Sequence, residues 1–255
     1  MKRPIFVLFA VLGMGTLMAY SNHAQSVSTA APKRIVTPDT PLNNRLVSAV
    51  LRVDLAGVQS ALHQGASADA LLGWEGQTNR IPITMAALGS PDLRKDYLPI
   101  FRLLVTNVSA PNAADEESGR TMLMAAVDMN DVESVQRLLA KGADINAQAK
   151  RWPQGATALY NAIAESGRGD QEASPVILCL LEHGADTNLP DENGVTPLIL
   201  AAQQGKVNVI RALLAHGADP ALRDKRGWTA IRWTSGRGWD DATALLRDHS
   251  PMTLV

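Results

Sequence analysis

A sequence pattern that recurs every 33 residues in its clearest copies constrains the fold of this chain more than any other feature. The tripeptide Gly-x-Thr marks the start of successive copies, at Gly119, Gly155, Gly194 and Gly227. The tripeptide Gly-Ala-Asp marks their ends, at Gly142, Gly184 and Gly217. The last two starts are 33 residues apart, and so are the last two ends. A period of this length predicts small structural units that stack on one another to bury a shared core.

The stretch 193–224 is the clearest copy, and it predicts two short helices joined by a tight turn. Thr196 is placed to cap the first helix with its hydroxyl, and Pro197 suits the first helical position. Gly205 is expected to end that helix, and Gly217 suits the left-handed residue that closes the second. The second helix should bury one apolar stripe, made of Val209, Ile210, Leu213 and Leu214. If Leu214 is buried in this way, Leu214→Ala should cost about 2–5 kcal/mol.

The period, with its Thr-Pro-Leu and Gly-Ala-Asp punctuation, resembles the ankyrin-repeat family. The resemblance covers roughly Pro41 to His249. It implies an all-α fold, an ankyrin-repeat solenoid of about six helix–turn–helix repeats with connecting hairpin-like turns. The first and last repeats are expected to be caps with one face in water. The family's usual histidine after Thr-Pro-Leu is absent, because the corresponding residues are Met124, Tyr160 and Ile199.

Four segments are predicted along the chain: a signal peptide at 1–24, a flexible linker at 25–40, the repeat domain at 41–250 and a loose tail at 251–255. Lys2 and Arg3 precede an uncharged apolar run from Ile5 to Met18, which is typical of a secretory signal peptide cut after Ala24. The run is shorter than the roughly 20 apolar residues of a membrane span. We therefore expect export to the bacterial periplasm without stable membrane insertion. An uncleaved amino-terminal anchor is the alternative.

The first two repeats depart from the pattern. Asn43 and Asn44 are candidate caps for the first helix of the domain. The second repeat opens at Ile81, where the other repeats have threonine. The helices expected in the first repeat contain residues 46–51 and 55–62. Residues 81–87 are expected to open the second repeat, and residues 97–105 to supply its second helix.

Two insertions, at 90–96 and 167–174, fall between the two helices of alternate repeats. Loops between packed helices tolerate extra residues, so length drift without a function is one interpretation. Because alternate repeats present equivalent loops on one edge of a stack, the other interpretation is a shaped contact edge. The sequence leaves both interpretations open.

Few residues are arranged for chemistry. Cys179 is the only cysteine and lies within a predicted helix, so we expect a structural or incidental thiol. His183 and His216 both precede the closing glycine of a repeat, where a partial positive charge favours a helix end. No histidine and carboxylate pair has metal-ligand spacing on one helix. The net charge of −1 and the absence of a basic block argue against nucleic-acid binding. We expect no catalysis, no cofactor and no metal.

The resemblance implies that a partner binds the concave groove formed by the turn tips and the first helices. In the family the groove is lined by the residue between Gly and Thr, the two residues before that Gly, and the end of the first helix. Carried to this chain, these rules and the tryptophans of the turns predict partner-binding residues at Arg120, Asp128, Met129, Trp152, Glu165, Glu192, Asn193, Gln203, Gln204, Arg226, Trp228 and Arg237. The same rules mark Ala156 and Val195, and Trp74 lies in a neighbouring turn. Trp233 falls inside a first helix and is expected to be packed. Trp and Arg are the residues that most often anchor an interface.

The sequence therefore predicts a monomeric, non-catalytic protein-binding module whose partner is another protein. Some exported immunity proteins and some accessory proteins of oxidative-stress defence combine a signal peptide with such repeats. We favour an immunity protein that blocks a secreted toxic effector, because blocking needs tight binding and no chemistry. An envelope scaffold or an oxidative-stress accessory protein is the alternative. An enzyme with an unrecognised site is a third hypothesis.

Overall fold

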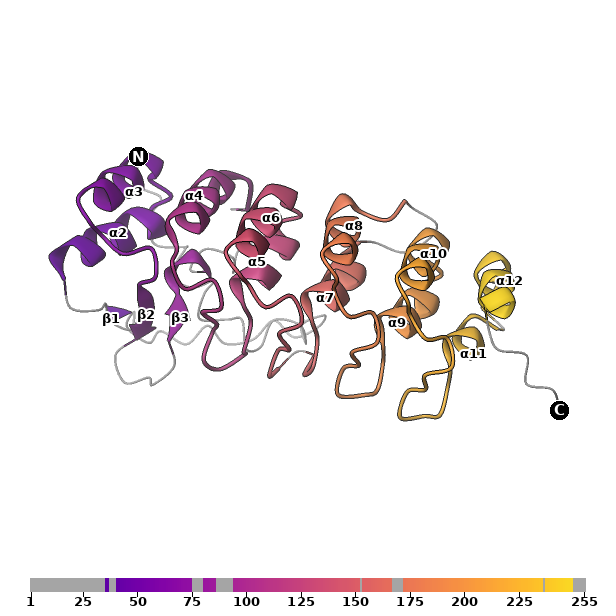
Figure 1. Ribbon diagram of the computed structural model, residues 1–255. Coiled ribbons are helices and arrows are strands. Elements are labelled where there is room, and N and C mark those ends of the chain that lie inside the picture. The colour runs from indigo at the N-terminus through magenta and orange to yellow at the C-terminus, as the bar shows by residue number, and fades with distance from the viewer. Residues whose placement is uncertain are drawn as a thin grey trace, which may run out of the picture. The chain divides into compact units, whose positions relative to one another are not determined.

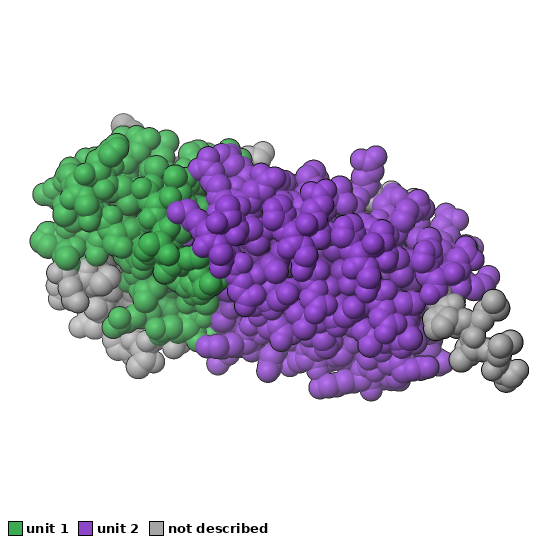
Figure 2. All heavy atoms as spheres, viewed as in Figure 1, with its two compact units in different colours: residues 1–117 green, residues 118–255 purple. Residues whose placement is uncertain are grey.

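The structure is a computed structural model, and it describes residues 35–36, 40–74, 80–85, 94–151, 153–166, 172–235 and 237–249. The chain divides into two compact units, residues 1–117 and residues 118–255, which Figure 2 colours green and purple. The predicted signal peptide at 1–24 and the tail at 251–255 lie outside the described residues.

Unit 1 combines helices with a small sheet. In chain order its elements are β1 (Ile35–Val36), α2 (Pro41–Leu51), α3 (Leu55–His63), β2 (Leu71–Trp74), β3 (Ile81–Pro82), the 3-10 helix η2 (Ile83–Met85) and α4 (Arg94–Asn107). Strand β2 is the middle strand and pairs antiparallel with both others, so that Val36 faces Gly73 and Ile81 faces Leu72. Helices α2 and α3 pack together, and α3 also contacts α4.

The start of the second repeat, of which residues 86–87 lie outside the described residues, differs from the repeat pattern, in which a threonine at the position of Ile81 caps a helix. Ile81 and Pro82 form strand β3, and Ile83–Met85 form one turn of 3-10 helix. Ile81 has no hydroxyl with which to cap a helix, and its backbone pairs with β2. The second helix of this repeat is confirmed as α4, whose buried Tyr97 hydroxyl lies 3.2 Å from the carbonyl oxygens of Ile83 and Thr84.

The predicted caps at Asn43 and Asn44 are wrong. Thr40 caps α2, because its hydroxyl accepts a hydrogen bond of 3.2 Å from the backbone N–H of Asn43. The side-chain oxygen of Asn43 accepts instead from the backbone N–H of Ser67, at 2.9 Å. Thr40 and strand β1 both fall inside the segment expected to be a linker, so part of that segment has a defined structure.

The described part of unit 2 contains four pairs of helices, in the order predicted from the repeats. They are α5 (Met122–Asp128) with α6 (Val132–Ala140), α7 (Ala158–Glu165) with α8 (Pro175–Glu182), α9 (Pro197–Gln203) with α10 (Val207–Ala215), and α11 (Ala230–Thr234) with α12 (Asp240–His249). The first helices pack in the series α5, α7, α9 and α11. The second helices pack in the series α6, α8, α10 and α12. Figure 1 shows the second helices α8 and α10 above α7 and α9, with the turn tips below them.

Threonine caps start three of the first helices, as the Gly-x-Thr pattern predicts. Thr121, Thr157 and Thr196 each accept a hydrogen bond of 3.2–3.3 Å from the backbone N–H three residues later. Thr229 occupies the cap position of α11 without such a bond. Since the cap satisfies a backbone donor that the helix leaves unpaired, it fixes where each first helix begins.

The apolar stripe of α10 is narrower than predicted. Val209, Ile210 and Leu213 are buried, whereas Leu214 is only half-buried. The equivalent Leu139 in α6 is half-buried too, beside a fully buried Leu138. The expected cost of Leu214→Ala therefore falls below the core range, and Leu213 takes its place as the core leucine. Among the described residues, no helix combines the length and the apolar character needed to cross a membrane.

Candidate protein-binding surface

The turn tips of unit 2 are tied together by backbone hydrogen bonds. The N–H of Lys150 donates to the carbonyl of Ser118 at 2.7 Å. The N–H of Glu192 donates to Gln154 at 2.7 Å, and that of Lys225 donates to Asn193 at 2.8 Å. Each tip is thus held against the next. We use the name "tip surface" for these turn tips together with the ends of the first helices α5, α7, α9 and α11.

Two predicted site residues at the start of the tip surface form an ion pair. The guanidinium of Arg120 contacts the carboxylate of Asp128, at the opposite end of α5. The side chain of Asp128 is only 11 % exposed, and Met129 beside it is half-buried. Since these opposite charges neutralise each other, this part of the tip surface offers little net charge to a partner.

Some positions marked by the family rules do not reach the surface. Ala156 and Val195, the residues between Gly and Thr in two repeats, are buried in the stack. Both side chains are apolar and small enough to pack between adjacent turns. The larger side chains of Arg120 and Trp228 occupy the same position in the other two repeats, and both are half-exposed. Trp152 lies outside the described residues.

The middle of the tip surface is acidic and polar. Glu165, Glu192 and Asn193 are exposed, and Gln203 and Gln204 are half-buried at the end of α9. The structure brings one predicted pair together here, because Arg237 Nη1 donates to the carbonyl oxygen of Gln203 at 3.2 Å. This bond joins the last two repeats of unit 2.

The last repeat carries a compact group of arginines and tryptophans, the Arg–Trp cluster: Arg226, Trp228, Arg232, Trp233 and Arg237. The two indole rings lie 4.8 Å apart between centroids, with planes inclined at 59°. The guanidinium carbon of Arg232 lies 4.8 Å from the Trp228 ring. Those of Arg226 and Arg237 lie 5.5 Å and 4.9 Å from the Trp233 ring. These distances are within the range of attractive cation–π contacts.

Hydrogen bonds to Asp224 hold the cluster in place. Its carboxylate accepts hydrogen bonds from the backbone N–H groups of Arg226 and Trp228, each at 2.9 Å, and from the indole N–H of Trp233 at 2.8 Å. Burial favours a raised pKa for this carboxyl, but the hydrogen bonds from Trp228, Trp233 and Arg226 and the charge of Arg226 outweigh it and lower the pKa. Trp233 is 8 % exposed, which confirms that it is packed.

The predicted site list contained Arg226, Trp228 and Arg237 but missed Arg232 and Asp224. The signal for Arg232 was its position four residues after Trp228 in a stretch where arginine and tryptophan alternate. Asp224 lies 33 residues after Asp191, at the equivalent position of the next repeat. Asp191 is also buried and accepts a hydrogen bond of 3.1 Å from the Tyr160 hydroxyl. The repeated aspartate therefore has a structural role in anchoring aromatic side chains.

A buried lysine links two repeats behind the tip surface. Lys206 is 2 % exposed and stands at the start of α10. Its ammonium group donates to the Ser166 hydroxyl at 2.8 Å and to the carbonyl oxygen of Ile163, both at the carboxyl end of α7. A cation is favoured there by the negative end of the helix dipole. Burial nevertheless lowers the pKa of Lys206 to about 8.

This pKa predicts a pH-dependent contribution to stability. Between pH 8 and the ordinary lysine pKa of 10.5, the unfolded chain still binds the proton that folded Lys206 has released. The stability of the native protein relative to a Lys206→Met variant should therefore rise across this window, by up to about 3 kcal/mol. Urea unfolding of both proteins at several pH values measures the difference. Parallel pH profiles for the two proteins would contradict the assignment.

The groups considered for catalysis have structural surroundings. The Cys179 thiol is buried, and burial, together with the charge of Glu182, raises its pKa, which disfavours the reactive thiolate. His183 Nδ1 lies 2.7 Å from the Cys179 carbonyl oxygen, and His216 Nδ1 lies 2.8 Å from that of Ala212. Both rings thus bind the last turn of their helices. Within the described part of the chain, no group of three or more His, Cys, Asp and Glu side chains is placed to hold a metal ion.

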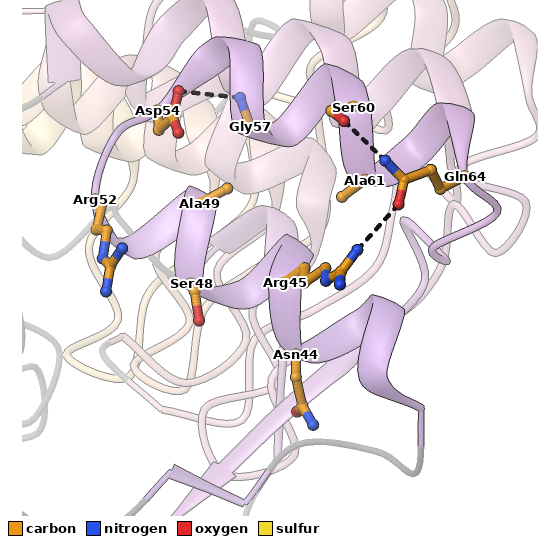
Figure 3. Close-up of a pocket in the computed structure, with 10 residues that line it drawn as sticks. All are labelled: Asn44, Arg45, Ser48, Ala49, Arg52, Asp54, Gly57, Ser60, Ala61 and Gln64. Carbon is orange, nitrogen blue, oxygen red and sulfur yellow. Dashed lines mark hydrogen bonds between the residues drawn. The ribbon is translucent and has the colours of Figure 1, made fainter.

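Unit 1 contains a surface hollow of about 450 Å³ that the sequence did not predict. Figure 3 shows the side chains that line it, from α2, α3 and the turn between them: Asn44, Arg45, Ser48, Ala49, Arg52, Asp54, Gly57, Ser60, Ala61 and Gln64. Two of these residues, Ala49 and Ala61, are buried, whereas most of the polar ones are exposed. Gln64 connects two of the polar ones, because it accepts from Arg45 at 3.2 Å and donates to Ser60 at 2.9 Å. The polar side chains on this face are consistent with the departure of the first repeat from the sequence pattern of the others.

Two family patterns match this chain, and both describe the same kind of repeat. "Ankyrin repeats (3 copies)" matches residues 46–149, and "Ankyrin repeats (many copies)" matches residues 180–232. Together they cover more than half of the chain and include parts of both units.

Characterised proteins match parts of this chain. The mouse B-cell lymphoma 3 protein homolog is 36 % identical over 109 residues, which are 43 % of this chain and 22 % of that protein. The mouse 2-5A-dependent ribonuclease is 45 % identical over 82 residues, 32 % of this chain and 10 % of that protein. The human 2-5A-dependent ribonuclease is 41 % identical over 104 residues, 41 % of this chain and 13 % of that protein. This chain therefore matches less than a quarter of the length of each of these relatives.

Proposed function

Because this chain belongs to the ankyrin-repeat family, whose repeats are generally protein-binding modules, we propose that it binds another protein through the tip surface and acts without catalysis. We further propose that it is exported to the bacterial periplasm and there blocks a secreted toxic effector. The family and the exposed side chains of the tip surface support the first statement. The predicted signal peptide supports the second statement. A protein that only blocks an effector needs no catalytic residues.

The observation that carries the proposal is the Arg–Trp cluster. It places exposed arginines and a half-buried Trp228 on the tip surface, and these are the side chains that most often dominate binding energy. The bonds from Asp224 and the contacts between rings hold the side chains in place before a partner arrives, so less conformational entropy is lost on binding. A standard interface needs about 800 Å² from each partner, which four adjacent turn tips and first helices can supply.

Replacing Arg226 and Trp228 together by alanine is expected to weaken partner binding by about a hundredfold or more, because each is a candidate hot spot. The matched control replaces Arg211 and Leu178, one arginine and one large apolar residue that are exposed on the second helices α10 and α8. Calorimetric titration of the captured partner into each variant measures the effect. Equal affinities of the two double variants would show that the partner does not use the tip surface.

The partner is found by capture. The purified protein serves as bait for envelope and secreted fractions of its own cells and of close competitors. One stoichiometric partner with a toxic hydrolytic activity that this protein inhibits would support the immunity role. A resident envelope protein or an antioxidant enzyme would replace that role by a scaffold or accessory one.

Deleting residues 167–174 distinguishes a partner that binds at the edge formed by the insertions from one that binds the tip surface. These residues fall in a predicted insertion, of which 167–171 lie outside the described residues. A partner bound on the tip surface should keep its affinity for the deletion variant. A scaffold that uses the inserted edge should lose its partners.

A further inference from the structure

We propose that the Arg–Trp cluster binds an acidic segment of the partner protein, so that carboxylates of the partner contact Arg226 and Arg232. This inference rests on the proposed function, because it names the chemistry of the partner at one end of the tip surface. It is carried by the charge of the last repeat, the placement of its arginines and the contrast with neighbouring repeats.

The charge of this region is strongly one-sided. Between residues 223 and 237 the chain carries five basic side chains and a single acidic one, Asp224. Asp224 is 6 % exposed, and three hydrogen-bond donors of the protein already occupy its carboxylate. Its charge therefore stabilises the fold of the tip from inside, while the arginines present positive charge outside.

The arginines are exposed and are held over aromatic rings. Arg226 and Arg237 lie over the Trp233 ring, and Arg232 lies over the Trp228 ring. Among the described residues, none of these three arginines forms an ion pair with a carboxylate. A guanidinium held over a ring keeps N–H groups at its edge, in the fork geometry that matches a carboxylate. The ring contacts thus orient the guanidinium groups without using up their hydrogen-bonding capacity.

The same geometry disfavours a stacked nucleobase. A base would need an open aromatic face, as single-stranded nucleic-acid binders provide. Here arginines lie over both indoles, and Trp233 is buried. The groups that the cluster offers to a partner are therefore cationic edges, which bind carboxylates in pairs of charge-assisted hydrogen bonds.

The surface next to the last repeat, between α7 and α9, carries acidic side chains. Glu165 and Glu192 are exposed on the tip surface, and Arg120 is neutralised by Asp128. An acidic segment is therefore attracted to the last repeat of unit 2 and repelled by Glu165 and Glu192 beside it. This complementarity assigns the acidic part of the partner to the α11 end of the surface.

The test uses a short fluorescein-labelled peptide of alternating glutamate and serine, with a glutamine and serine peptide of equal length as its neutral counterpart. Fluorescence anisotropy should show binding of the acidic peptide only, and its affinity should fall by about tenfold or more in the variant R226Q/R232Q. The control variant R211Q/R247Q removes the same charge from exposed positions on α10 and α12 and should bind as the native protein does. Arg237 is left in place because it holds the Gln203 carbonyl.

Three results would overturn the proposal: equal binding of acidic and neutral peptides, equal losses in the two double variants, or tighter binding of a labelled oligothymidylate than of the acidic peptide. Its failure is distinguishable from failure of the proposed function. If a captured partner binds R226Q/R232Q with native affinity but does not bind R226A/W228A, only the proposal of an acidic segment is refuted. A capture that yields no partner removes the proposed function itself.

Discussion

Replacing Leu213 by alanine is expected to lower the free energy of unfolding by about 2–5 kcal/mol. Leu213 is fully buried in α10, a helix that packs against α8, α9 and α12. Truncation removes apolar contacts and leaves a cavity that rigid neighbours fill only in part. Because α10 contacts helices of three repeats, the loss should appear in the unfolding of unit 2 as a whole.

The matched control is the adjacent leucine. Leu214 is half-buried, so Leu214→Ala should cost only roughly 1 kcal/mol. Urea unfolding followed by circular dichroism measures both values. A larger loss at Leu214 than at Leu213 would mean that α10 is rotated relative to the structure described above.

Replacing Gly205 by alanine is the second change with a large expected effect. Gly205 has a φ of +69°, and a Cβ there would lie less than 3.0 Å from three atoms of the Trp239 ring. The left-handed conformation alone costs a non-glycine residue about 1–2 kcal/mol. Displacing the indole adds about 1–3 kcal/mol of overpacking. We therefore expect a total loss of about 2–5 kcal/mol.

Gly217 separates the two contributions. Its φ is +86°, but a Cβ built there has nothing within 4 Å. Gly217→Ala should therefore cost only the backbone term, about 1–2 kcal/mol. Thermal or urea unfolding of both variants gives the comparison. Equal losses would show that Trp239 does not pack on the turn at Gly205.

The features that sequence predicted well are those in which one residue acts on its own helix. Thr196 caps α9 and Gly205 ends it because cap and turn geometry depend on a few neighbouring residues. The repeat pattern also placed the helix pairs of unit 2 in the correct order. In unit 1 the pattern failed at Ile81, where the missing hydroxyl and the pairing with β2 changed a helix start into a strand.

The residues of the candidate site were predicted from their positions in the repeat, which do not show which side chains contact one another. The family rules marked Arg120 and Asp128 separately, whereas the structure joins them in an ion pair. The rules missed Arg232, because they mark the end of the first helix, whereas Arg232 lies within α11 and contacts the Trp228 ring. Lys206 was missed for a related reason, since its ammonium binds carbonyl and hydroxyl groups of the preceding repeat. Such contacts between repeats depend on the stacked structure and leave no local pattern in the sequence.

Hydrogen–deuterium exchange of the protein with and without its captured partner tests the central claim most directly. If the partner binds the tip surface, amide protection should increase in the turn tips and in the first helices α7, α9 and α11, with the largest change around the Arg–Trp cluster. The outer second helices α8, α10 and α12 should exchange as in the protein alone. Protection confined to those second helices, or to unit 1, would contradict the account.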